Sequence, residues 1–122
     1  MAAIEAEELT RIFHVGGEEV RALDGLTMTL EEGRLAAVVG PSGSGKSTLM
    51  ALLGGLDTPT GGNVAVHGQL LNGMAPEALA QYRRTTVGFV FQDFFLLSHL
   101  TAEENVEVPL KLSQISRSER RD

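Results

Sequence analysis

Residues 40–48 read Gly-Pro-Ser-Gly-Ser-Gly-Lys-Ser-Thr, and this stretch decides the fold class. It satisfies the spacing G-x-x-x-x-G-K-[ST], in which a glycine-rich loop joins a strand to a helix. The flanks agree, because an apolar run precedes the loop at residues 35–39 and good helix formers follow it at residues 46–53. The stretch therefore predicts a phosphate-binding loop in an α/β fold.

The residue types in this loop suit the binding of a nucleoside triphosphate. Glycines let the backbone turn tightly and direct N–H groups at phosphate oxygens, and the helix N-terminus adds partial positive charge. We expect Lys46 to contact the β- and γ-phosphates, Ser47 to ligate Mg²⁺ and Thr48 to donate to the α-phosphate. The predicted nucleotide-binding residues of the loop are Gly40, Pro41, Ser42, Gly43, Ser44, Gly45, Lys46, Ser47 and Thr48.

The composition excludes or disfavours several classes of function for these residues. The 122 residues are 43% hydrophobic, which is enough for one domain with a packed core. Cysteine is absent, so disulfides, thiol catalysis and cysteine-ligated metals are excluded. A net charge of −6 disfavours nucleic-acid binding, and no apolar run is long enough to span a membrane. We therefore expect a cytoplasmic chain.

Patterns of apolar residues, glycine and proline predict the secondary structure. We expect three helices: one that directly follows the loop and ends at Gly54-Gly55, one with Pro76 in its first turn, and one opened by a capping box of Thr101 and Glu104. The predicted strands cover residues 3–13, 20–23, 26–30, 35–39, 64–66 and 87–91.

A second motif indicates which class of phosphate-loop protein this is. Residues 87–110 read VGFVFQDFFLLSHLTAEENVEVPL. Together with the loop, this stretch resembles the N-terminal half of ABC-type ATP-binding subunits, nearest to the ATPases of lipoprotein-releasing and macrolide-exporting systems, over roughly residues 4–115. The resemblance implies a P-loop NTPase fold of the ABC type, with an antiparallel β subdomain and part of a RecA-like core, incomplete within residues 1–122.

The resemblance also implies roles for individual residues. Phe13 matches the aromatic residue that stacks on adenine, where many members have tyrosine; the alternative is an ordinary core aromatic. Gln92 matches the glutamine that reaches Mg²⁺ and the attacking water, so Lys46 and Gln92 would be the catalytic residues and Ser47 and Gln92 the metal ligands. The implied cofactors are ATP and Mg²⁺.

The implied partners follow from the same family. The region from Asp93 to Leu100 would dock an integral-membrane permease subunit, although its apolar residues also suit plain core packing. Full-length subunits would form a homodimer, peripheral on the inner face of the cell membrane, with no nucleic acid bound. The substrate and the direction of transport are not encoded in any motif of these residues.

Three family motifs are not found in these residues: a signature like LSGGQ, an apolar strand ending in Asp-Glu, and a later switch histidine. We therefore expect residues 1–122 to be a partial domain of a longer protein, with residues 35–39 lacking a strand neighbour on one edge. The alternatives are a non-hydrolysing nucleotide-binding module or cell-division-type scaffold, a soluble ABC ATPase of DNA repair or translation, and a metabolic P-loop kinase. The acidic balance and the absence of cysteine disfavour the soluble ABC ATPase of DNA repair or translation, and the Gln92 stretch disfavours the kinase.

We predict little or no ATP hydrolysis by the 122 residues alone. The sequence provides a phosphate cradle but no residue in the pattern of a general base, and binding alone does not stabilise a transition state. Phosphate release measured with MgATP tests this. Substantial turnover that disappears in Lys46→Ala would contradict the prediction.

Overall fold

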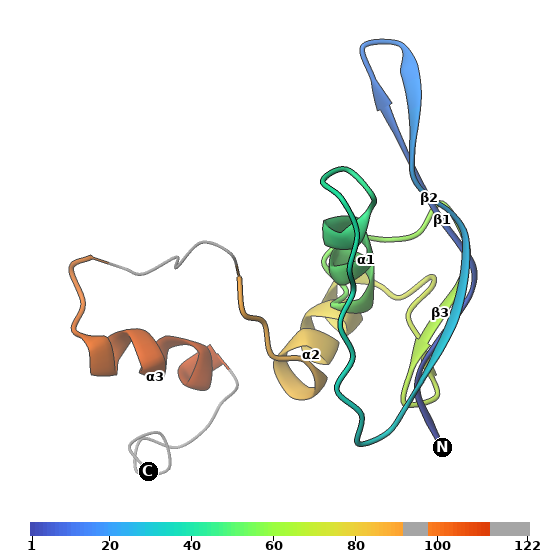
Figure 1. Ribbon diagram of the computed structural model, residues 1–122. Coiled ribbons are helices and arrows are strands. Elements are labelled where there is room, and N and C mark those ends of the chain that lie inside the picture. The colour runs from blue at the N-terminus through green and yellow to red at the C-terminus, as the bar shows by residue number, and fades with distance from the viewer. Residues whose placement is uncertain (92–97, 113–122) are drawn as a thin grey trace. The chain divides into compact units, whose positions relative to one another are not determined.

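The computed structural model describes residues 1–91 and 98–112 (Figure 1). The chain divides into two compact units, Met1–Ala80 and Gln81–Asp122.

The first unit is built on a long antiparallel hairpin. Strand β1 covers Ala2–Val15 and β2 covers Glu18–Glu31, and the two-residue connection between them has positive φ at both Gly16 and Gly17. Such a turn matches the right-handed twist of the strands, which is why glycine serves at both positions. The strands cross the unit as a twisted ribbon whose turn projects beyond the rest of it (Figure 1).

Two shorter strands complete a four-stranded sheet. Strand β3 covers Gly61–Val66 and β4 covers Gln69–Leu70, and the order in the sheet is β2-β1-β3-β4. Every pairing in it is antiparallel. The predicted antiparallel β subdomain is therefore confirmed, and the predicted strands at residues 3–13, 20–23, 26–30 and 64–66 lie inside it.

Helix α1, Lys46–Leu53, starts directly after the glycine-rich loop, as predicted. It ends in a Schellman motif, in which Gly55 N–H donates to the Leu52 carbonyl at 3.2 Å and Leu56 N–H to the Ala51 carbonyl at 2.9 Å. Gly55 has a φ of +72°, a conformation that glycine adopts without strain. The Gly54-Gly55 stop expected from the sequence is thus confirmed, with Gly55 as its left-handed residue.

The core of the first unit lies between α1 and the sheet. Leu9 of β1 and Val64 of β3 are 0% exposed, and Leu52 of α1 is 1% exposed. Other apolar side chains surround these three; the further buried residues of the unit are Ala6, Leu23, Leu49, Val66, Leu71 and Leu79. Removal of this apolar surface from water is the main force that holds α1 on the sheet.

Two predicted strands do not form, and those predictions are wrong for this structure. Residues 35–39 and 87–91 have no regular structure, and the four-stranded sheet contains neither. Leu35 and Val90 are each 102% exposed. An apolar run becomes a strand only where neighbouring strands satisfy its N–H and C=O groups, so sequence pattern alone was insufficient here.

Two further helices carry signals that the sequence predicted. Helix α2 covers Pro76–Thr86 and contains the buried Tyr82, whose phenol pKa is raised by that burial. Helix α3 covers Ala102–Leu112 and opens with the predicted capping box: Glu104 N–H donates to Thr101 Oγ1 at 3.1 Å, and Thr101 N–H donates to Glu104 Oε1 at 2.9 Å. In the described part of the chain, no helix has the length and apolar character needed to cross a membrane.

The core assignment predicts that Leu9→Ala destabilises the protein by about 2–5 kcal/mol, because it removes buried methyl groups and leaves a cavity. The matched control is Leu70→Ala, since Leu70 in strand β4 is 50% exposed; we expect it to cost less than about 1 kcal/mol. Urea unfolding followed by circular dichroism measures both. Equal losses would contradict the placement of Leu9 in the core.

Candidate phosphate-binding site

The glycine-rich loop is exposed and is shaped by its glycines. Residues 40–44 all lie at the surface, and Gly43 and Gly45 have φ values of +82° and +96°. The Lys46 ammonium turns back over the loop, where Nζ donates to the Pro41 carbonyl at 3.0 Å and to the Gly40 carbonyl. An ammonium group has three N–H donors, so Lys46 can exchange these carbonyls for phosphate oxygens.

The first turn of α1 suits an anion. Its N-cap is Gly45, which has no side chain to satisfy the terminal N–H groups, and no acidic residue lies in the first turn. The N–H groups of a first helical turn have no acceptor within the helix and carry partial positive charge. Ser47 is exposed and Thr48 is half-buried at the same end. These residues fit the polyphosphate of a nucleotide.

Gly45 lies in close contact with the hairpin. A Cβ at this position would be 2.4 Å from the Ala22 carbonyl oxygen and 3.1 Å from Leu23 Cδ2, both on β2. Backbone cannot yield at such a distance, so only glycine allows the loop to approach the strand this closely. The start of α1 is thereby fixed against β2.

Phe13 lies on β1, half-buried and paired with Val20 of β2. The Arg11 guanidinium carbon lies 4.2 Å from the centroid of its ring. Leu23, which contacts the phosphate loop at Gly45, pairs with Arg11, and Phe13 is two residues further along the same strand. The structure therefore brings Phe13 and the loop to the same part of the hairpin.

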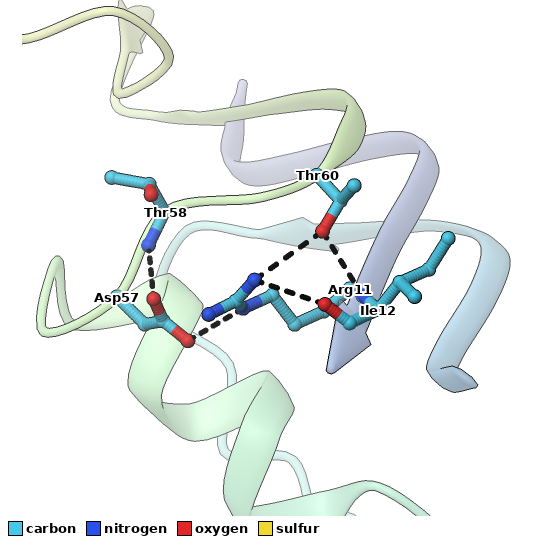
Figure 2. Close-up of polar contacts among 5 residues, drawn as sticks. All are labelled: Arg11, Ile12, Asp57, Thr58 and Thr60. Atoms are coloured by element: carbon cyan, nitrogen blue, oxygen red, sulfur yellow. Dashed lines mark hydrogen bonds and ion pairs between the residues drawn. The ribbon is translucent and has the colours of Figure 1, made fainter. Parts of the chain in front are cut away.

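Arg11 is at the centre of a polar cluster that the sequence did not indicate (Figure 2). Its Nε donates to Asp57 Oδ2 at 2.8 Å, and its Nη1 donates to the Ile12 carbonyl at 3.2 Å and to Thr60 Oγ1 at 3.4 Å. Ile12 N–H also donates to Thr60 Oγ1, at 3.0 Å. The cluster joins β1 to the loop between α1 and β3.

Most of the other predicted site residues lie outside the part of the chain that the structure describes. Gln92, and the region from Asp93 as far as residue 97, lie outside the described residues. Ser98 and His99, which complete the predicted docking region with Leu100, are exposed in a turn. Within residues 1–91 and 98–112 no cluster of three histidine, cysteine or acidic residues could hold a metal ion by itself.

The sequence profile described as "ABC transporter" matches residues 23–122. This chain belongs to the ABC transporter family. Its relatives include the macrolide export ATP-binding/permease protein MacB of Hyphomonas neptunium, 50% identical over 119 residues, and that of Escherichia coli strain K12, 46% identical over 117 residues. These alignments cover 98% and 96% of this chain but 18% of each relative. The resemblance inferred from the two motifs is confirmed.

Solved structures establish the ABC cassette fold. One shows the ATP-binding cassette MJ0796 as a dimer in a post-hydrolysis state bound to ADP and Pi; it has a TM-score of 0.89, 39% identity, and coverage of 97% of this chain. A second, the dimeric structure of MJ0796 described as a bacterial ABC transporter cassette, also has a TM-score of 0.89, with 40% identity. This chain spans 52% of the length of both. The predicted ABC-type fold is thus confirmed.

The contact of Gly45 with β2 predicts unequal effects of alanine at two loop glycines. Both Gly43 and Gly45 have positive φ, but a Cβ at Gly43 would have no atom within 4 Å. We expect Gly43→Ala to cost about 1–2 kcal/mol through backbone strain alone. Gly45→Ala should cost about 1–3 kcal/mol more, because the loop must move away from Ala22.

Chemical unfolding of the two variants beside the unchanged protein measures the difference. Equal free energies of unfolding for Gly43→Ala and Gly45→Ala would show that the approach of the loop to Ala22 contributes nothing to stability.

Proposed function

We propose that this chain is the nucleotide-binding part of an ABC transporter subunit that binds MgATP and, in the complete protein, hydrolyses it. The observation that carries the proposal is the loop at the N-terminus of α1, where Lys46 lies over an exposed glycine-rich turn. Membership of the ABC transporter family and the 39% identity to a cassette bound to ADP and Pi support a nucleotide as the ligand.

The roles of the side chains follow from their places in the loop. Lys46 would leave the loop carbonyls and neutralise the β- and γ-phosphates, while N–H groups of the first helical turn would bind their oxygens. Ser47 would ligate Mg²⁺ together with Gln92, and Thr48 would donate to the α-phosphate. Phe13 would stack on the adenine. Lys46 and Gln92 would be the residues of these 122 that act on the γ-phosphate during hydrolysis.

The partners would be those of a transporter. We propose a homodimer of ATP-binding subunits, for which the dimeric cassettes of similar fold give support. The region from Asp93 to Leu100 would contact a membrane permease, which places the chain at the cytoplasmic face of the cell membrane. The similar MacB proteins are named as combined ATP-binding and permease proteins, which supports a permease beside this domain.

The proposal predicts that Lys46→Gln weakens MgATP binding by about 10- to 100-fold, which is the loss expected when a charged hydrogen-bond donor to phosphate is removed. Binding of AMP should be nearly unchanged, because AMP lacks the β- and γ-phosphates. Titration calorimetry on the protein expressed from its complete reading frame measures both affinities.

Arg34→Gln is the matched control, since Arg34 is also basic and exposed but lies before the loop. It should bind MgATP as the unchanged protein does. The assigned role of Lys46 would be wrong if Lys46→Gln weakened AMP and MgATP binding equally, or if it weakened neither.

A further inference from the structure

The polar cluster around Arg11 does more than join two segments. The same guanidinium that binds Asp57 also lies over the ring of Phe13, 4.2 Å from its centroid. Arg11 and Phe13 are two residues apart on β1, so their side chains project from the same face of the strand. A cation in this position is attracted by the electron-rich ring face, and it occupies that face.

Joining β1 to the loop after α1 does not require the guanidinium. Thr60 N–H donates to the Thr10 carbonyl at 2.8 Å, and Ile12 N–H donates to Thr60 Oγ1 at 3.0 Å. These bonds already hold the two segments side by side. The contacts of Arg11 with Asp57, with the Ile12 carbonyl and with Thr60 instead fix the plane of the guanidinium itself (Figure 2).

Another arginine of the same hairpin shows what an ordinary surface ion pair is like here. Arg21 pairs with Glu19 and Asp24, and its side chain is 51% exposed. The side chains of Arg11 and Asp57 are only 24% and 29% exposed. Arg11 therefore loses more hydration than Arg21. Its contacts with the ring of Phe13 and with the Asp57 carboxylate offset this loss.

The position of Phe13 relative to the phosphate loop makes this contact relevant to a ligand. Leu23 contacts the loop at Gly45 and pairs with Arg11 across the hairpin. Phe13 is two residues beyond Arg11, which is about 7 Å along a strand. A ligand with its phosphates in the loop thus has an aromatic ring close by, with one face of that ring already covered.

We propose that Arg11 is a positioning residue for a purine base, and that the base stacks on the face of Phe13 opposite the guanidinium. This inference rests on the proposed nucleotide site. Arg11, held by Asp57, fixes the orientation of the ring before the ligand arrives. A pre-ordered ring loses less rotational freedom on binding, so the base gains affinity without any direct contact with Arg11.

The test separates the base from the phosphates. The dissociation constants of MgATP and of inorganic tripolyphosphate with Mg²⁺ are measured by titration calorimetry on the protein from its complete reading frame. Their ratio reports what the nucleoside adds. Phe13→Ala should lower this preference for ATP by about 5- to 150-fold, the usual value for one base stacked on an aromatic residue.

Arg11→Gln should lower the same preference by about 2- to 5-fold, as expected for loss of a cation over a ring, and should leave tripolyphosphate binding unchanged. Arg11→Lys keeps the charge but not the planar fork and should restore part of the preference. Arg21→Gln is the control and should change neither ligand. In the Phe13→Ala protein, Arg11→Gln should cause no further loss.

Several results would overturn the inference. An unchanged preference in Arg11→Gln, or an equal loss for both ligands, would leave Arg11 a purely structural residue. Tighter ATP binding would show that the guanidinium covers the face the base needs. If Phe13→Ala had no effect, the base would lie elsewhere while the proposed function stands. If the unchanged protein failed to bind ATP, both proposals would fall.

Discussion

The attachment of α1 to the β1–β2 hairpin at both of its ends is the constraint on which the candidate site depends. At the start of the helix, Gly45 lies so close to the Ala22 carbonyl that no Cβ fits between them. After its end, Thr60 N–H donates to the Thr10 carbonyl, and Ile12 N–H donates to Thr60 Oγ1, so this loop is held on β1 at either side of Arg11. Arg11 pairs across the hairpin with Leu23, the residue next to Ala22. Both ends of the helix are therefore fixed at one place on the sheet, and the phosphate loop cannot shift along the strands without breaking one attachment.

The attachments and the core contribute in different ways. Leu49 and Leu52 of α1 are 5% and 1% exposed, so apolar burial along the middle of the helix provides most of the free energy that holds it on the sheet. The ion pair between Arg11 and Asp57 is partly exposed and adds little by itself. Its contribution is geometric, because a short and directional contact holds the guanidinium in one orientation over the ring of Phe13. Such precision matters for a site in which phosphate and base must be bound together.

Features encoded by neighbouring residues could be predicted from the sequence. The start of α1 after the glycine-rich loop, the Gly54-Gly55 stop and the capping box of Thr101 and Glu104 depend on contacts within a few residues, and each forms as expected. The Arg11 cluster could not be predicted in this way. Arg11 and Asp57 are 46 positions apart, and either residue alone reads as an ordinary surface charge. Only the pairing of β1 with β3 and the short loop after α1 bring them together. The role of Phe13 was suggested by family resemblance, but its contact with Arg11 was not.

The failure of the two strand predictions has a different cause. Residues 35–39 and 87–91 have the apolar character of buried strands, but an apolar pattern does not provide a hydrogen-bonding partner for the backbone. Phe89 and Phe91 show how much of a strand remains without one. Their rings stack with centroids 5.3 Å apart and planes 6° from parallel, a contact between residues two apart that an extended chain allows and a helix does not. The local conformation is thus set by neighbouring residues in the sequence. The hydrogen-bond ladder that defines a strand comes from adjacent strands, so strand formation depends on context more than helix formation does.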